Sequence, residues 1–120
     1  MKASPRSLFA LVLLVLAVSL ASQWWAGRQE QSMGRQVAAL AQPGDIRMLS
    51  SETCVFCTAA RRWMTEHRVR FEECFIERDA QCKALYDTTL ARGTPTLIVR
   101  GQVQLGFNAS NILAALQARG

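Results

Sequence analysis

The sequence predicts an α/β domain, with a mixed four-stranded sheet flanked by helices, behind an apolar N-terminal helix. Three observations predict this architecture. Residues 46–118 alternate between short apolar runs and stretches of helical spacing, in the order β-α-β-α-β-β-α. Residues 8–21 contain no charged side chain. A Cys-x-x-Cys motif, Cys54 to Cys57, lies between the first strand and the first helix of the domain.

The N-terminal segment, residues 1–26, predicts a membrane anchor or a secretory signal. Lys2 and Arg6 precede the apolar run, and Ser19-Leu20-Ala21 fits the small-x-small pattern of a signal cleavage site. A spanning helix needs about 20 apolar residues, which this run supplies if Trp24-Trp25 lies at the membrane interface. The paired tryptophans favour an inner-membrane anchor with the domain in the periplasm or another extracytoplasmic space. The alternative is secretion after cleavage.

Residues 27–45 are polar with scattered small apolar side chains, which predicts a stalk between the membrane and the domain. Within the stalk, residues 35–42 have the spacing of a short helix, which Pro43-Gly44 ends. Residues 46–120 then form the domain. Without Lys2 and Arg6 the chain has 12 basic and 9 acidic residues, a net charge of +3 with no clustered basic stripe. We therefore expect no nucleic-acid partner.

The first half of the domain predicts a strand, a helix and a second strand. Ile46–Leu49 is a short apolar strand. From the Cys-x-x-Cys motif to His67, apolar residues recur three and four positions apart, as on one face of a helix. Val69–Ile76 alternates between two faces, which is typical of a strand.

The second half adds two helices. Asp79 is a good N-cap for a helix that reaches about Leu90 and that Gly93 ends. Asn108 or Ser110 caps the last helix. The buried stripe of this last helix is predicted to contain Ile112, Leu113 and Leu116.

The order of the elements predicts how the strands pair. Strands that helices separate are expected to pair in parallel through right-handed crossovers. Thr96–Val99 and Val103–Leu105 are instead joined by a tight turn at Arg100-Gly101-Gln102, which predicts an antiparallel hairpin at one edge of the sheet. The result is a mixed sheet.

Cys54 and Cys57 are the candidate catalytic residues. The N-terminus of a helix presents unpaired N–H groups and partial positive charge, which stabilise a thiolate over a thiol. Cys54 would be the exposed nucleophile, and Cys57, one turn further in, could displace a mixed disulfide. A Cys-x-x-Cys motif also occurs in metal sites and structural bridges, but its position between a strand and a helix favours a redox site.

Pro95 stands directly before the strand Thr96–Val99. A proline there would normally confine a strand to an edge position, yet this strand is among the most apolar runs of the soluble part. A cis Thr94–Pro95 bond is one explanation. An ordinary trans proline that opens a strand is the other.

Together these motifs resemble the thioredoxin superfamily, and most closely its glutaredoxin branch. The segment Ser51–Cys57 resembles the glutaredoxin active-site loop, with an aromatic residue, Phe56, before the second cysteine. Thr94-Pro95 is similar to the cis-proline loop of the superfamily, and Gly106-Phe107 resembles the turn before the last glutaredoxin helix. The likeness covers residues 46–118.

The resemblance implies a thioredoxin-like fold and a substrate site built around these loops. It implies a cis Pro95 packed beside Cys54, with the backbone of Thr94 pairing to a bound substrate like an added strand. The residues that it assigns to substrate binding are Thr94, Pro95, Phe56, Gly106 and Phe107.

Three departures from the glutaredoxin pattern concern the substrate. Ser51 stands where glutaredoxins usually carry a lysine that binds a glutathione carboxylate, and Gly106-Phe107 replaces Gly-Gly. Residues 108–110 lack the acidic side chains that commonly hold the amino end of glutathione. A protein thiol or disulfide is therefore the expected substrate, glutathione is only a co-substrate candidate, and no cofactor or metal is expected.

Cys74 and Cys82 form the second pair. Four cysteines allow three connectivities. We expect Cys54–Cys57 together with a structural Cys74–Cys82 disulfide, because a redox pair must remain free to cycle. Two alternatives remain open: Cys74 and Cys82 as buried free thiols, or as a relay that passes electrons to the first pair.

The predicted function is a thiol–disulfide oxidoreductase, acting as a reductase on protein substrates outside the cytoplasmic membrane and recharged by an unidentified redox partner. One alternative is a copper-type metal chaperone domain, which also places a Cys-x-x-Cys motif after its first strand but has the order β-α-β-β-α-β. Another is a non-catalytic assembly factor with a structural disulfide.

Overall fold

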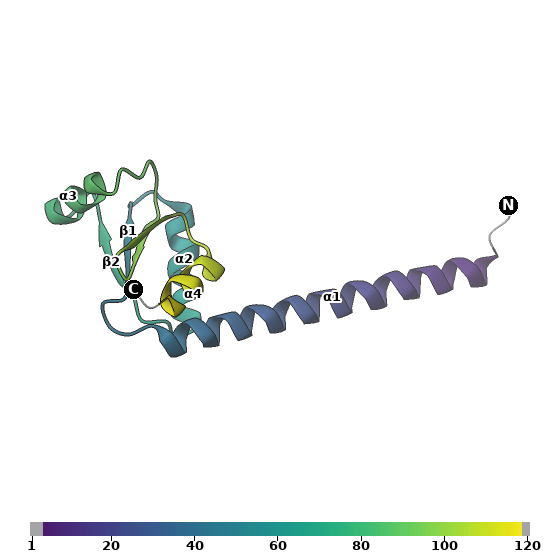
Figure 1. Cartoon of the computed structure of the whole chain (residues 1–120). Helices are drawn as coiled ribbons and strands as arrows, with labels where there is room; N and C mark the ends of the chain where they lie inside the picture. The colour runs from purple at the N-terminus through teal and green to yellow at the C-terminus, as the bar shows by residue number, and fades with distance from the viewer. Residues whose placement is uncertain (1–3, 119–120) are drawn as a thin grey trace. The chain divides into compact units, whose positions relative to one another are not determined.

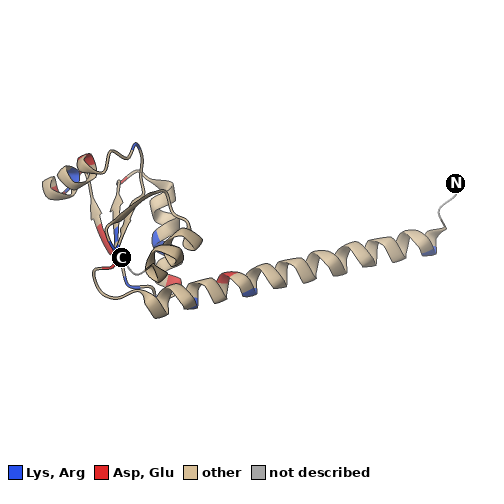
Figure 2. Ribbon diagram, viewed as in Figure 1, with Lys and Arg blue, Asp and Glu red and all other residues tan. Residues whose placement is uncertain are grey.

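The computed structural model describes residues 4–118, which form two compact units, Met1–Ser32 and Met33–Gly120. The predicted charge at Lys2 and the last two residues of the predicted domain lie outside the described residues. Helix α1, Pro5–Leu40, contributes to both units. It is long and apolar enough to cross a membrane, with a mean hydropathy of 2.0 over its most apolar stretch. Figure 2 shows its N-terminal half without charge beyond the first turns. Such a helix is compatible with a membrane anchor or a signal sequence.

The second unit contains a four-stranded sheet and three further helices (Figure 1). The strands are β1 Ile46–Ser50, β2 Glu72–Phe75, β3 Thr96–Val99 and β4 Gln102–Leu105. The helices are α2 Val55–Glu66, α3 Ala80–Thr88 and α4 Ala109–Gln117. The predicted element order and the mixed sheet are confirmed. This order is not the β-α-β-β-α-β order of a metal chaperone domain.

The strand order is β2-β1-β3-β4, with β1 parallel to β2 and the β3–β4 hairpin antiparallel as predicted. The expectation that β3 would also pair in parallel is wrong, because β3 runs antiparallel to β1. The start of β3 consequently lies beside the end of β1, with Thr96 opposite Leu49. Phe75 at the end of β2 aligns with Ser50, and Leu105 at the end of β4 aligns with Thr96. We call this the active-site end of the sheet.

Two elements are shorter than predicted. Strand β2 starts at Glu72 and not at Val69, because a turn with Arg68 at a φ of 58° leads out of α2 and the Val69 N–H donates to the carbonyl of Met64. Helix α3 ends at Thr88, two residues before Leu90, whose φ of 59° does not continue a helix. Asp79 and Asn108 cap α3 and α4 as predicted.

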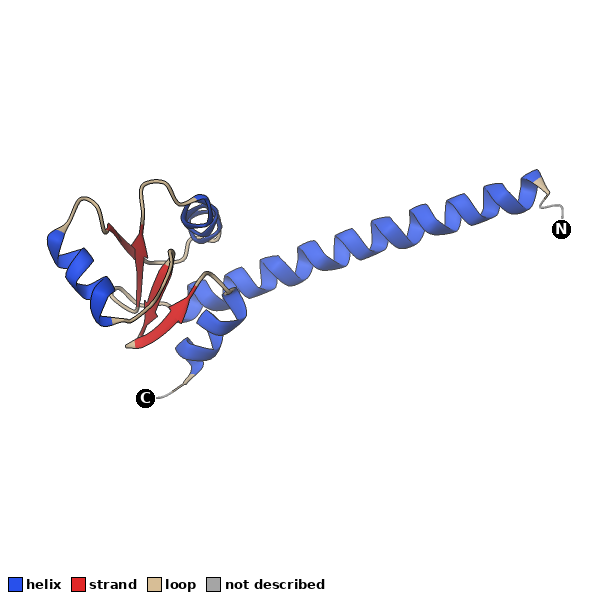
Figure 3. Ribbon diagram, turned by 90° about the horizontal axis from the view of Figure 1, so that it is seen from above, coloured by secondary structure: helices blue, strands red, loops and turns tan. Residues whose placement is uncertain are grey.

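The core lies between one face of the sheet and the helices α2, α4 and the end of α1 (Figure 3). Its buried members are Val37, Ala41, Ile46, Met48, Ala60, Met64, Val69, Leu97, Val99, Ile112, Leu113, Ala115 and Leu116. The structure differs here from the predicted stalk. Residues 33–40 are helical and belong to the compact unit, with Gly34 and Val37 buried.

Helix α2 is tied to the sheet by a charged contact. Arg61 donates two hydrogen bonds to the Glu73 carboxylate on β2, at 2.7 and 2.8 Å, and the Ser50 hydroxyl at the end of β1 donates a third, at 2.7 Å. Burial would raise the pKa of Glu73, but the hydrogen bonds from Arg61 and Ser50 and the Arg61 charge outweigh it and hold that pKa below its usual range. The Arg61–Glu73 pair therefore fixes α2 beside the end of β1.

We expect Glu73→Gln to lower the free energy of unfolding at neutral pH by about 1–3 kcal/mol, because Arg61 loses its charged acceptor. Folding lowers the pKa of Glu73. This contribution is therefore present above the pKa of the unfolded carboxyl, about 4.3, and is lost as the pH falls through the lower pKa of the folded state. Denaturant unfolding of the wild type and of Glu73→Gln, at neutral pH and at about pH 3, measures how much the two differ in free energy of unfolding. If the wild type and Glu73→Gln differed in free energy of unfolding as much at pH 3 as at neutral pH, that result would contradict the assignment.

The end of α1 approaches α2 closely at Gly34. A methyl group at this position would overlap the ring of His67, which follows the last turn of α2. The His67 ring is held in place, since its Nδ1 lies 2.8 Å from the carbonyl of Trp63 and its centroid lies 4.3 Å from the Trp63 ring. Only glycine fits between the two helices without displacing this ring.

Gly34→Ala should therefore destabilise the domain, although alanine favours a helix over glycine by about 1 kcal/mol. Gly27→Ala is the matched control, because no atom lies within 4 Å of a methyl group placed there. We expect a lower denaturation midpoint for Gly34→Ala and an unchanged or higher one for Gly27→Ala. Equal denaturation midpoints for the two variants would show that α1 can move away from His67 without loss of stability.

Candidate active site

Cys54 and Cys57 form a disulfide at the start of α2, with their Cα atoms 5.2 Å apart. Cys54 is the N-cap residue of this helix, and its sulfur accepts a hydrogen bond from the Cys57 N–H at 3.0 Å. Cys57 is fully buried, whereas Cys54 is partly exposed. A thiolate at Cys54 would occupy the site where a helix stabilises negative charge most. The geometry suits an attacking Cys54 and a resolving Cys57.

The loop before Cys54 is held by the segment that follows β2. The hydroxyl of Ser51 donates to one oxygen of Glu77, and the N–H of Glu52 donates to the other at 3.2 Å. The Glu52 carboxylate in turn pairs with Arg78. The hydrogen bond from Ser51, ahead of other contributions, lowers the pKa of Glu77. The position that carries lysine in glutaredoxins is thus engaged with a carboxylate of the same chain.

The bond between Thr94 and Pro95 is cis, and Pro95 is buried. The hydroxyl of Thr96 donates to the carbonyl of Gly93 at 2.7 Å and closes the turn before the proline. The Gly106 N–H donates to the carbonyl of Pro95 at 2.8 Å. The cis-proline turn and the β4–α4 turn are therefore joined at the active-site end of the sheet.

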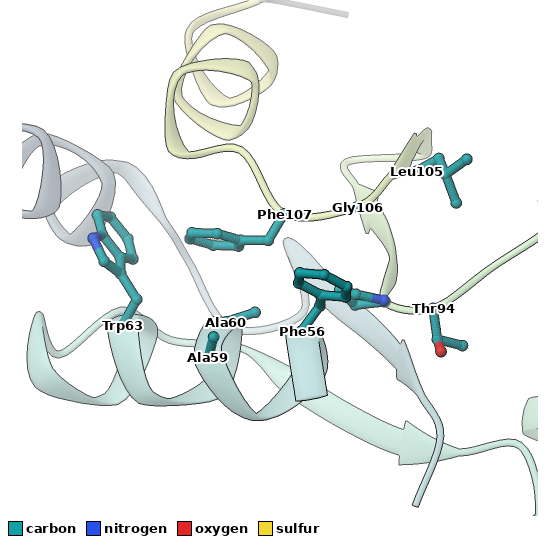
Figure 4. Close-up of a pocket in the computed structure, with 9 residues that line it drawn as sticks. Phe56, Ala59, Ala60, Trp63, Thr94, Leu105, Gly106 and Phe107 are labelled. Carbon is teal, nitrogen blue, oxygen red and sulfur yellow. The ribbon is translucent and has the colours of Figure 1, made fainter. Parts of the chain in front are cut away.

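A cavity of about 540 Å³ lies between α2 and these two turns. All five residues that the sequence assigns to substrate binding line it, namely Phe56, Thr94, Pro95, Gly106 and Phe107 (Figure 4). The other four lining residues carry no assignment from the sequence and are Ala59, Ala60, Trp63 and Leu105. Three of these follow Phe56 on α2 at positions i+3, i+4 and i+7, so helical spacing could have identified them.

The cavity is apolar and aromatic. The rings of Trp63 and Phe107 pack at 5.3 Å between centroids, and the Phe56 ring lies near Phe107 with 75% of the residue exposed (Figure 4). No charged side chain is among its nine lining residues. Thr94 carries the one hydroxyl among these nine residues. The cavity thus suits an apolar side chain next to a short stretch of peptide backbone.

Cys74 and Cys82 are joined by a second disulfide between β2 and α3, with their Cα atoms 6.0 Å apart. Side chains alternate along a strand, so Cys74 points to the face opposite that of Glu73, which contacts α2 through Arg61. Figure 1 likewise shows α3 on the other side of the sheet from α2. The structure therefore does not bring the two cysteine pairs together, and a direct relay between them has no support. Within residues 4–118, no group of three or more His, Cys, Asp or Glu side chains could hold a metal ion.

Comparison with known proteins finds similarity in family and in fold. The glutaredoxin family model matches residues 46–104. The chain is 25% identical to a mutant of the thioredoxin-like protein BC3987, with a TM-score of 0.53 over 61% of this chain and 95% of that one. It is 26% identical to methanoredoxin from Methanosarcina acetivorans, with a TM-score of 0.51 over 65% and 90% of the two chains.

A glutaredoxin from Archaeoglobus fulgidus, 16% identical with a TM-score of 0.50 over 62% of this chain and 87% of that one, shares the fold. No curated protein sequence matches the chain. The family model, the solved structures and the position of the cysteine pair agree with one another. Residues 46–104 therefore resemble glutaredoxins and have a thioredoxin-like fold, with the Cys54–Cys57 disulfide at the start of the first helix of the domain.

Proposed function

We propose that the protein is a thiol–disulfide oxidoreductase that reduces protein disulfides outside the cytoplasmic membrane. The observation that carries the proposal is the Cys54–Cys57 pair at the N-terminus of α2, beside a cavity formed with the cis-proline turn. The apolar part of α1 supports membrane attachment, and two disulfides in one small domain are typical of an oxidising compartment.

The reaction consists of two exchange steps. In the reduced enzyme, the Cys54 thiolate attacks one sulfur of a substrate disulfide, which forms a mixed disulfide and releases the other sulfur as a thiolate. The Cys57 thiol, deprotonated as it reacts, then attacks Cys54, releases the second substrate thiolate and restores the enzyme disulfide. The substrate gains the two electrons that the enzyme loses. A dithiol partner must then reduce Cys54–Cys57 for another turnover.

The cavity favours a protein substrate over glutathione. Glutathione carries two carboxylates and an ammonium group, and none of the nine lining residues has a charge to pair with them. Ser51, at the usual lysine position, is bonded to Glu77. An apolar side chain beside the substrate cysteine would instead be buried against Phe56, Trp63 and Phe107, and full burial of such a side chain contributes about 1.5–3 kcal/mol. We propose that the backbone of Thr94 pairs with the same substrate segment.

Cys57→Ser should trap the enzyme as a mixed disulfide between Cys54 and its substrate, because the resolving thiol is missing. The adduct can be collected after acid quenching and identified by mass spectrometry under non-reducing conditions. Cys54→Ser is the control and should trap nothing. Absence of any adduct at Cys54 from cells that express the exported chain would contradict the proposed function.

Phe56→Ala should raise the KM for a disulfide peptide with a large apolar residue beside its cysteine by about tenfold, the equivalent of about 1.4 kcal/mol of lost contact. The KM for glutathione disulfide should stay unchanged. Val55→Ala is the matched control, because Val55 is also exposed, at 78%, but does not line the cavity. Equal effects of Phe56→Ala on both substrates would contradict the assignment of the cavity.

A further inference from the structure

We propose that the disulfide-closed segment 74–82 positions the active-site loop, with Glu77 as the residue that makes the contact. The inference rests on the proposed function, because it assigns to that segment a role in presenting Cys54. The sequence predicts a structural role for Cys74–Cys82, with free thiols or an electron relay as alternatives. Through this contact the second disulfide would act on the first without any exchange between them.

The segment is rigidly built. Cys74 at its start and Cys82 near its end are bonded to each other. Between them, the N–H groups of Arg78 and Asp79 both donate to the carbonyl of Phe75, each at 3.1 Å. The Asp79 side chain caps α3 by accepting from the N–H of Gln81 at 2.8 Å and from that of Cys82 at 3.3 Å. The disulfide thus encloses a turn whose backbone is held at its start by hydrogen bonds to the Phe75 carbonyl and at its end by the Asp79 cap.

This turn extends to the active-site loop. The Ile76 N–H donates to the carbonyl of Ser50 at 3.0 Å and so continues the β1–β2 ladder by one bond. Glu77 comes next, and its two carboxylate oxygens accept from consecutive residues of the loop, Ser51 and Glu52. Glu77 is exposed, so we do not expect this contact to contribute much to the stability of the domain. A carboxylate with one oxygen on each of two neighbouring residues can nevertheless fix their orientation.

The orientation of the loop determines the position of the Cys54 sulfur. The Cys54 N–H donates to the carbonyl of Ser51 at 3.2 Å, and Cys54 is the N-cap whose sulfur accepts from the N–H of Cys57. A shift of Ser51 therefore moves Cys54, whose sulfur must lie both at the N-terminus of α2 and within reach of the substrate. Arg78, from the same segment, pairs with Glu52 and keeps its negative charge engaged.

The alternative is that Glu77 acts only through its charge. A nearby carboxylate disfavours a thiolate, so its removal would lower the pKa of Cys54 and raise its reactivity. Glu77→Gln and Glu77→Ala remove the same charge, but only glutamine retains an oxygen that can accept from the loop. The comparison between these two variants therefore cancels the effect of charge and isolates that of position.

The experiment uses the full chain in detergent, reduced at Cys54–Cys57 under conditions that leave Cys74–Cys82 closed, and then alkylated at Cys54 with iodoacetamide across a range of pH. We expect Glu77→Ala to alkylate about two- to fivefold more slowly than Glu77→Gln near neutral pH, the change that partial loss of stabilisation at a helix N-terminus gives. We also expect its kcat/KM on a protein disulfide to fall by about 10- to 100-fold while Glu77→Gln stays near the wild type. Glu72→Ala, which removes an exposed ion pair from β2, is the matched control.

A second arm tests whether Glu77 acts through the closed segment. The paired change Cys74→Ala with Cys82→Ala should slow alkylation in the same direction, and adding Glu77→Ala to it should have a smaller effect than in the wild type. Far-UV circular dichroism checks that each variant is folded, and the comparison of the two Glu77 variants stands even if the cysteine variant unfolds. Equal alkylation rates for Glu77→Ala and Glu77→Gln, or additive effects of the cysteine and Glu77 changes, would overturn the proposal. Alkylation needs no substrate, so a chain without turnover would contradict the proposed function and leave this test intact.

Discussion

The direction of four strands decides where the chemistry of this domain is located. Because β1 and β2 run in parallel and β3 runs against them, the ends of β1, β2 and β4 and the start of β3 meet at one end of the sheet. The segments that leave or enter there carry the cysteine pair, Glu77, the cis-proline turn and Phe107. A parallel β3 would have placed Pro95 at the opposite end, far from Cys54. Each contact of the candidate site depends on this arrangement.

Local signals in the sequence predicted most of this end of the sheet. The cysteine spacing, the Thr94-Pro95 pair before an apolar strand and the tight hairpin turn act over a few residues, and each has a backbone consequence that is largely independent of the rest. The caps Asp79 and Asn108 belong to the same class. The family resemblance then joined these separate motifs into one site, as the lining of the cavity shows.

Contacts between distant segments were harder to predict. Nothing local reveals that Glu77 bonds to Ser51 and Glu52, or that Arg61 reaches Glu73, because charged residues that pair and those that face solvent look alike in sequence. The direction of β3 was mispredicted since a helix between two strands usually implies a parallel crossover. Here α3 and the loop after it return the chain to the same end of the sheet. Trp63 lines the cavity, but the apolar spacing of α2 does not by itself distinguish a core position from one beside a cavity.

The limits of the compact unit have a consequence for how the chain can be processed. Its first member is Met33, well downstream of the small-x-small motif that ends at Ala21. A peptidase that cut after Ala21 would leave every core residue in place, including Val37 and Ala41. The released and the tethered forms would then contain the same folded domain. The apolar stretch of α1 and the stretch that belongs to the core are separate parts of a single helix, so either can change during evolution without the other.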